Sequence, residues 1–239
     1  MKIKNFILIK FIFIFIFLIN SNEAKTEDCD TTVSSSLTSQ LECTDDDTLN
    51  VTINGSVIKT GADTIHAKSH SDVTIDNKGT ISASTNQAIN MQHAVNSTVT
   101  NSGTIEATLR NAILMDGTSA DNITINNSGT LKAGKKQVIL ATNSENTTII
   151  NSGTIETTNS SNPNTGGINY YNTSGAAING ATITNSGTIF AYGTGIRFGT
   201  LGIASKAVNN MTITNSGTIE GGTASIAVHN ANATGTNII

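Results

Sequence analysis

One short phrase recurs along most of the chain and limits the folds that are open to it. Six well-matched copies occupy residues 73–83, 98–107, 123–133, 147–157, 181–191 and 211–221. A seventh copy, at 49–61, is displaced by one residue near Asn54. The phrase glycines lie 24, 24, 26, 24, 34 and 30 residues apart: Gly55, Gly79, Gly103, Gly129, Gly153, Gly187 and Gly217. A repeat of this length is typical of solenoids, in which each copy is one structural unit stacked on the next.

Within each phrase, apolar and polar residues alternate with a period of two, as in a β-strand with one buried face. Around Gly79 the inward set is Val73, Ile75, Asn77, Gly79, Ile81 and Ala83. An Asn and a Gly in the inward register indicate a corner, because both tolerate the left-handed conformation. A second column follows each phrase: Ile65, Ile89, Ile113, Ile139, Ile168, Ile196 and Ile226. We therefore expect strand, corner, strand and a further strand in each unit.

A coil of about 24 residues cannot bury its inward face alone, but coils stacked about 4.8 Å apart pair their backbone groups with both neighbours. The predicted fold is all-β, a right-handed parallel β-helix of about seven coils. Leucine-rich repeats, propellers and hexapeptide helices fit the repeat worse. The repeated asparagines would form an amide ladder along the axis: Asn77, Asn101, Asn127, Asn151, Asn185 and Asn215.

The first 24 residues have the pattern of a secretory signal peptide. Lys2 and Lys4 precede the apolar run 6–18, and cleavage is expected after Ala24. The uninterrupted apolar stretch 11–19 is far shorter than the ~20 residues that span a bilayer, so a membrane anchor is the weaker alternative. The sequence therefore predicts an exported protein.

The charge of the mature chain argues against a nucleic-acid partner. Thirteen basic and seventeen acidic side chains become ten and sixteen when residues 1–24 are removed, a net charge of about −6. The only two arginines are Arg110 and Arg197. Nucleic-acid binding depends on clustered Lys and Arg, which this chain lacks.

Residues 25–48 precede the first repeat and are expected to form an N-terminal cap segment. An exported protein meets oxidising conditions, so we expect Cys29 and Cys43 to form a disulfide. This bridge would close a loop of about 15 residues and contribute ~3 kcal/mol to stability. Two free thiols are the alternative.

The repeat resembles the passenger region of bacterial autotransporter proteins. The resemblance covers about residues 49–239 and is carried by Asn-Ser-Gly-Thr-Ile at 101–105, 151–155, 185–189 and 215–219. It implies export to the periplasm, passage through a C-terminal outer-membrane β-barrel, and display as a cell-surface adhesin or, less often, as the carrier of an enzyme domain. The chain departs from this pattern because it has no C-terminal barrel of alternating strands.

The repeats stop where a further coil is due, within residues 233–239. The open end of a β-helix exposes unpaired N–H and C=O groups above a row of apolar side chains. We therefore expect a chain that is truncated at its C-terminus, with an outer-membrane barrel in any longer form. We also expect end-to-end self-association.

The outward residues offer little for catalysis. Three residues after each glycine the chain reads Ser82, Glu106, Lys132, Glu156, Phe190 and Glu220. Two coils, about 10 Å, separate Glu106 from Glu156, with Lys132 between them, which is typical of a solvated charge stripe. We expect no catalytic residue, although a polysaccharide lyase or hydrolase stays open as the alternative.

No cofactor or metal site is expected. His66 and His70 are four residues apart, a spacing that does not bring side chains together on a strand, and His93 and His229 are isolated. The acidic run 45–47 fits a solubilising cap, with a cation site as the alternative.

The repeat is interrupted near its C-terminal end, where ligand contacts are most expected. Insertions at about 157–167, 171–181 and 199–210 should emerge as loops. The aromatic residues Tyr170 and Phe198 continue the inward column and should be core. The candidate ligand contacts are the outward aromatic residues Tyr171, Phe190 and Tyr192.

These features predict a secreted or surface-displayed protein with an adhesive or structural role. Its partners would be glycans or surface proteins of a host or of the environment. Incidental surface aromatics and a spacer stalk without binding activity are the alternatives.

Overall fold

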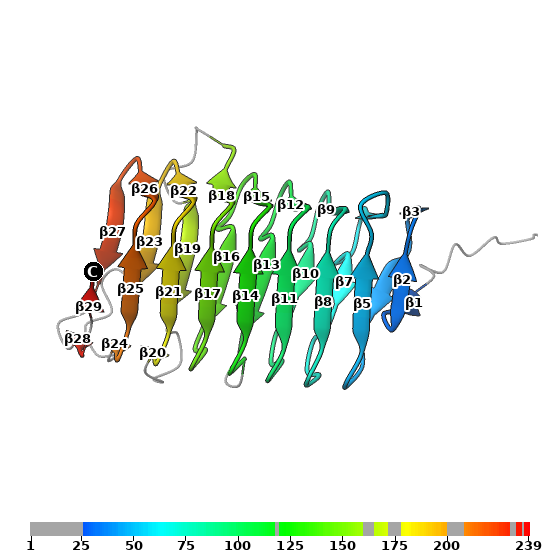
Figure 1. Cartoon of the computed structure of the whole chain (residues 1–239), viewed down its shortest axis with the longest axis horizontal. Coiled ribbons are helices and arrows are strands. Elements are labelled where there is room, and N and C mark those ends of the chain that lie inside the picture. The colour runs from blue at the N-terminus through cyan, green and yellow to red at the C-terminus, as the bar shows by residue number, and fades with distance from the viewer. Residues whose placement is uncertain are drawn as a thin grey trace, which may run out of the picture.

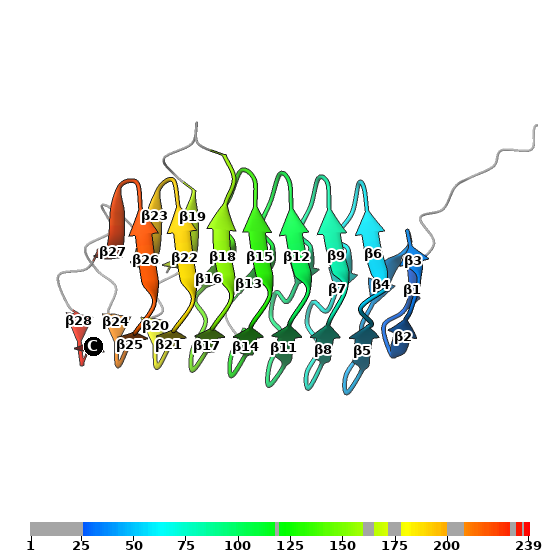
Figure 2. The same ribbon diagram turned by 45° about the horizontal axis from the view of Figure 1, so that its top comes forward.

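The chain winds into a parallel β-solenoid of about seven coils, as predicted, with successive coils side by side along one axis (Figures 1 and 2). The computed structural model describes residues 26–117, 120–159, 165–171, 178–199, 208–229, 233–235 and 237–239. Every regular element within these ranges is a β-strand. The expected signal peptide lies outside the described residues.

Three long sheets run the length of the stack, and each coil contributes one strand to each in turn. Sheet 1 contains β1 (Thr26–Asp28), β4 (Gln40–Glu42), β7 (Ile65–His66), β10 (Ile89–Asn90), β13 (Ile113–Asp116), β16 (Ile139–Thr142), β19 (Gly166–Tyr171), β23 (Thr194–Phe198) and β27 (Ala224–Val228). Sheet 2 contains β2 (Thr31–Val33), β5 (Thr48–Val51), β8 (Thr74–Asn77), β11 (Thr98–Asn101), β14 (Thr124–Asn127), β17 (Thr148–Asn151), β21 (Thr182–Asn185), β25 (Thr212–Asn215) and β29 (Asn237–Ile238).

Sheet 3 completes each coil with the second half of the phrase. It contains β3 (Ser36–Leu37), β6 (Ser56–Lys59), β9 (Thr80–Ala83), β12 (Thr104–Ala107), β15 (Thr130–Ala133), β18 (Thr154–Thr157), β22 (Thr188–Ala191) and β26 (Thr218–Gly221). A small fourth sheet at the C-terminal end contains β20 (Ile178–Asn179), β24 (Val208–Asn209) and β28 (Ala233–Thr234).

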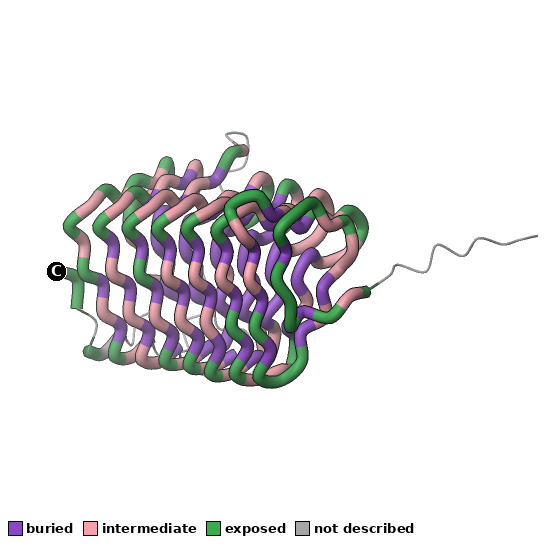
Figure 3. Tube along the Cα trace, turned by 45° about the vertical axis from the view of Figure 1, so that its right-hand side comes forward, coloured by how far each residue is buried: buried purple, intermediate pink, exposed green. Residues whose placement is uncertain are grey.

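The core is a narrow interior that the inward residues fill, coil after coil (Figure 3). The isoleucine column of sheet 1 is continuous from Ile65 to Ile226, because each member pairs in register with the next. The aromatic residues Tyr170 and Phe198 are fully buried, and their rings stack with centroids 5.1 Å apart. The hydroxyl of Tyr170 meets Thr147 Oγ1 at 2.6 Å. Burial raises the pKa of Tyr170 well above its ordinary value.

The repeated asparagines lie inside the corner between sheets 2 and 3 and form a ladder. Each Nδ2 donates to the Oδ1 of the next asparagine at 2.7–2.8 Å, in the series Asn77, Asn101, Asn127, Asn151, Asn185 and Asn215. The same Nδ2 of Asn127 also donates to the carbonyl of Thr154 at 3.1 Å. A buried polar side chain at this position must donate a hydrogen bond to one neighbouring coil and accept a hydrogen bond from the other, which an amide can do.

The expected left-handed conformation is wrong for this corner. None of the seven phrase glycines, all within the described part, has a positive φ. They are required for another reason: a Cβ on Gly129 would fall on the carbonyl oxygen of Gly103 in the preceding coil. Apart from Gly61, which lies between sheets 3 and 1, the left-handed residues of the described part lie between sheets 1 and 2, in a column that includes Asp72, Asn96, Asn122, Asn146, Gly180 and Asn210.

The irregular seventh copy contains two extra residues, not a one-residue slip. Val51 pairs with Asn77 and Ser56 pairs with Thr80, so four residues separate Val51 from Ser56 where the regular corner has two. The additional length places Ile53 in solvent, with 80% of its surface exposed. Asn54 therefore does not enter the ladder, and Val51 takes the ladder position of this coil.

The stack begins before residue 49. Strands β1, β2 and β3 join the three sheets in parallel register and form the first coil, and β4 begins the second, so the cap segment belongs to the solenoid. A disulfide joins Cys29 to Cys43, and both side chains are buried. The disulfide links two successive coils, just after each leaves sheet 1.

Candidate functional site

The three outward aromatic residues do not form one cluster. Phe190 of β22 and Tyr192 just beyond it pack edge to face with ring centroids 5.0 Å apart. Phe190 lies in register between Glu156 and Glu220 on sheet 3. Tyr171 instead ends β19 on sheet 1. The structure therefore separates an aromatic pair on one side from a single tyrosine on another.

The outward charges of sheet 3 form a stripe of neighbouring contacts. Ser82 Oγ donates to Glu106 Oε1 at 3.0 Å, and Lys132 Nζ lies 3.0 Å from Glu156 Oε1. Glu106 pairs in register with Lys132, and Lys132 pairs with Glu156. Lys132 thus lies between the two carboxylates.

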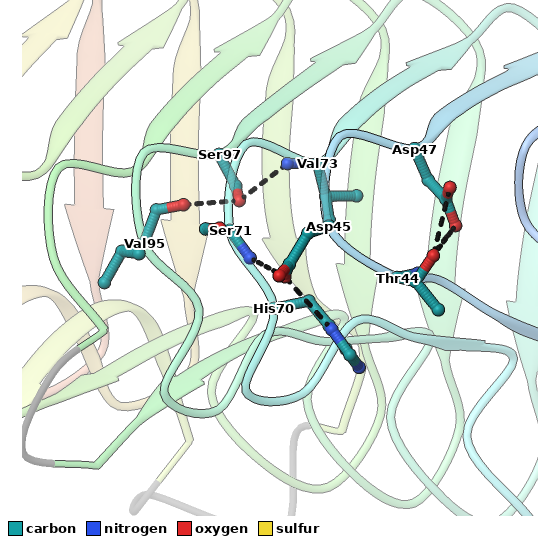
Figure 4. Close-up of polar contacts among 8 residues, drawn as sticks. All are labelled: Thr44, Asp45, Asp47, His70, Ser71, Val73, Val95 and Ser97. Carbon is teal, nitrogen blue, oxygen red and sulfur yellow. Dashed lines mark hydrogen bonds and ion pairs between the residues drawn. The ribbon is translucent and has the colours of Figure 1, made fainter.

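The acidic run 45–47, which follows β4, makes contacts within its own coil and with the next coil (Figure 4). The backbone N–H of Ser71 donates to Asp45 Oδ1 at 2.8 Å, and His70 Nδ1 lies 3.2 Å from the same atom. These contacts, first the Ser71 N–H and then the His70 ring, lower the pKa of Asp45. The carboxylate of Asp47 accepts from the backbone N–H of Thr44 at 2.6 Å. The carboxylates thus hold the corner between sheets 1 and 2.

The histidines are dispersed. His66 Nδ1 lies 2.6 Å from Glu42 Oε2, and this contact and the His70–Asp45 contact join the same two neighbouring coils at separate positions. Within the described ranges, no three His, Cys, Asp or Glu residues come together as metal ligands. His93 and His229 each lie at a different coil, where the chain leaves sheet 1.

Tyr171 lies at the centre of a polar cluster on the outward side of sheet 1. Its hydroxyl oxygen lies 3.1 Å from Asn169 Nδ2, 3.2 Å from Arg197 Nη1 and 3.3 Å from Gln137 Nε2. Arg197 Nη2 also donates to Thr194 Oγ1 at 2.9 Å. We call Gln137, Asn169, Tyr171 and Arg197 the Tyr171 cluster.

Two atoms of the Tyr171 cluster are buried without a hydrogen-bond partner. They are Arg197 Nε, a donor, and Asn169 Oδ1, an acceptor. Asn169 is fully buried, although it faces outward from β19. No described carboxylate lies within ion-pair distance of the Arg197 guanidinium. The cluster therefore combines a guanidinium that has no carboxylate partner among the described residues with two buried polar atoms that lack a hydrogen bond.

Of this cluster, the sequence pattern indicated Tyr171 alone as a site residue. Arg197 lies between the inward residues Ile196 and Phe198, so the alternation predicts that it faces outward. Because the chain has only two arginines, an outward arginine at this position could have been identified as a candidate site residue. Gln137 precedes β16 and has no repeat signature. It comes close to Tyr171, 34 residues later, only because the coils stack.

Comparison with known proteins gives no match to a family model, a curated protein or a solved structure. The described part of the chain also has no helix with the length and apolar content to cross a membrane.

Proposed function

We propose that this is an exported protein, displayed at the cell surface or secreted, that acts in adhesion or as a surface structural element and not in catalysis. The resemblance of its repeat to autotransporter passenger regions supports this proposal. By the same resemblance, an outer-membrane β-barrel would anchor a longer form of the protein.

One observation carries the proposal: the binding features are concentrated where the regular stack changes. Strands β7 to β16 of sheet 1 have two to four residues, whereas β19 has six and β23 has five. Three members of the Tyr171 cluster, Asn169, Tyr171 and Arg197, lie on these longer strands, and the Phe190–Tyr192 pair lies at the end of β22. A rigid stalk of regular coils would thus present a distinctive surface near its C-terminal end.

Binding of the purified chain to an array of glycans and matrix proteins tests this function. We expect binding to at least one ligand and no depolymerisation of polysaccharides. Substitution of Tyr171 and Tyr192 by alanine should lower the affinity. An unchanged affinity would remove these aromatic residues from the site, and an array without any bound ligand would contradict the adhesive role.

We also propose end-to-end self-association through the last coils. Ile219, Ile226 and Val228 are only partly buried, whereas their counterparts one coil earlier are fully buried. Ile238 and Ile239 are 55% and 76% exposed. Sedimentation should show oligomers that grow with concentration, and replacing both residues by lysine should suppress them. A monomer at high concentration would contradict the proposal.

A further inference from the structure

We propose that the Tyr171 cluster binds the carboxylate of an acidic sugar, a uronic or a sialic acid. This inference rests on the proposed adhesive function and specifies the ligand class of its site.

The cluster has more hydrogen-bond donors than acceptors. Three nitrogen atoms, from Gln137, Asn169 and Arg197, point at the one hydroxyl oxygen of Tyr171. A phenol oxygen has two lone pairs, so it cannot satisfy three donors. The hydroxyl proton of Tyr171 has no acceptor among the described residues. Arg197 Nε is a further donor of this cluster and is buried without a hydrogen-bond partner. The missing component is therefore an acceptor.

Charge identifies this acceptor as an anion. Arg197 is half-buried with its Nε atom enclosed, and it has no described carboxylate partner. A partly buried guanidinium whose Nε atom has no acceptor favours an anion, and a carboxylate matches its plane with two parallel hydrogen bonds. The single guanidinium and the acidic mature chain do not suit a polyphosphate such as nucleic acid.

The second unsatisfied atom adds a requirement for a hydroxyl group. Asn169 Oδ1 is a buried acceptor and needs a donor from the ligand. Asn169 and Arg197 are register partners on β19 and β23, so their side chains are neighbours, and a ligand hydroxyl that bonds Asn169 would enter the enclosed space beside Arg197. A carboxylate beside a hydroxyl occurs in uronic and sialic acids.

The cluster is held in place before a ligand arrives. Asn111 Nδ2 donates to the backbone carbonyl of Gln137 at 2.9 Å and to its Oε1 at 3.3 Å, which directs the Gln137 Nε2 toward Tyr171. Thr194 Oγ1 fixes one end of the guanidinium. Groups that are positioned in advance lose less entropy when a ligand binds.

Calorimetry with the purified chain tests this inference, with trigalacturonic acid and sialyllactose as separate probes. Trigalacturonic acid methyl ester and lactose are the matched neutral ligands. We expect one acid to bind at least tenfold more tightly than its neutral counterpart, and the better acid identifies the source of the carboxylate. Equal binding of acid and neutral ligand would overturn the inference.

Two variants locate the binding. Arg197→Gln should lower the affinity for the acid at least tenfold, and Tyr171→Phe should lower it severalfold, while Arg110→Gln removes the other arginine and should change nothing. If Arg197→Gln does not fold, Arg197→Lys keeps the charge without the planar fork and should still bind more weakly.

The outcomes distinguish this inference from the function on which it rests. An Arg197 variant that unfolds earlier but keeps its affinity for the acid would show a purely structural cluster. Binding to neutral glycans or matrix proteins, independent of Arg197, would overturn the carboxylate site and leave adhesion standing. Absence of any ligand would contradict both.

Discussion

Val51 lies directly beneath Asn77 in the stack and leaves the buried Oδ1 atom of Asn77 without a hydrogen-bond donor. Every later ladder position has an asparagine below it, whose Nδ2 supplies that bond. The amide ladder therefore begins with an unsatisfied acceptor.

Val51→Asn should extend the ladder by one member. Its Nδ2 would donate to Asn77 Oδ1, and the bond should stabilise the fold by about 1 kcal/mol in urea unfolding. The matched variant Val51→Asp has the same shape but presents a carboxylate to that acceptor, so it should destabilise. If Val51→Asn and Val51→Asp lower the free energy of unfolding equally, the unsatisfied Oδ1 atom of Asn77 does not weaken the native ladder.

Asn127→Asp should break the ladder at its centre. Asn127 Nδ2 donates to Asn151 Oδ1 at 2.7 Å and to the Thr154 carbonyl, and an ionised carboxylate cannot donate. We expect urea unfolding at neutral pH to show a free energy of unfolding that is lower by about 3–5 kcal/mol. This loss should shrink as the pH approaches about 4, where the carboxylate is protonated. Asn126→Asp, on the outward side of the same strand, should change stability by less than about 0.5 kcal/mol.

Gly129→Ala should disrupt the corner through a backbone clash. The added Cβ would fall on the carbonyl oxygen of Gly103, which cannot move without breaking the adjacent coil. We expect a loss of about 3 kcal/mol in thermal or urea unfolding. Gly61→Ala is the control, since Gly61 has φ +89° but open space around it, and should cost about 1 kcal/mol. Equal losses would show that conformation, and not close approach, selects glycine.

Removal of the Cys29–Cys43 bridge should weaken the first coil. The two cysteines are 14 residues apart, and closing a loop of this size contributes about 3 kcal/mol. The variant Cys29→Ala with Cys43→Ala should lose about this amount, and hydrogen exchange should rise first in β1 to β4. Mass spectrometry of the purified chain should show two hydrogens fewer than in the reduced protein. Free thiols under oxidising conditions would contradict the bridge.

Asp45 should make stability depend on acid pH. Its pKa is lowered, so its ionised form stabilises the fold above the unfolded value of about 3.9, and this contribution disappears as the pH falls through the lower folded pKa. Asp45→Asn should flatten the acid limb of thermal midpoints measured between about pH 2 and 7. Asp46→Asn is the matched neighbour. An NMR titration that places Asp45 at or above its ordinary pKa would contradict the assignment.

The amino-acid sequence by itself determined the repeating parts of the molecule. The alternation around Gly79 predicts which side chains face inward, and the recurrence of Asn101, Asn127 and Asn151 at the same place in each phrase predicts the ladder. Such inferences succeed because identical coils must stack in register, so a local pattern repeated many times specifies its own long-range contacts.

Only the tertiary structure decided the features that depend on coils of unequal length and on close contacts between neighbouring coils. The clash that selects Gly129 involves an atom of the preceding coil, and the two extra residues after Val51 become visible only through the register with Asn77. Arg197 contacts Tyr171, which lies 26 residues earlier in the chain. The insertions in this region alter the regular spacing between equivalent residues. No periodic signal encodes such a contact, because stacking geometry alone brings these residues together.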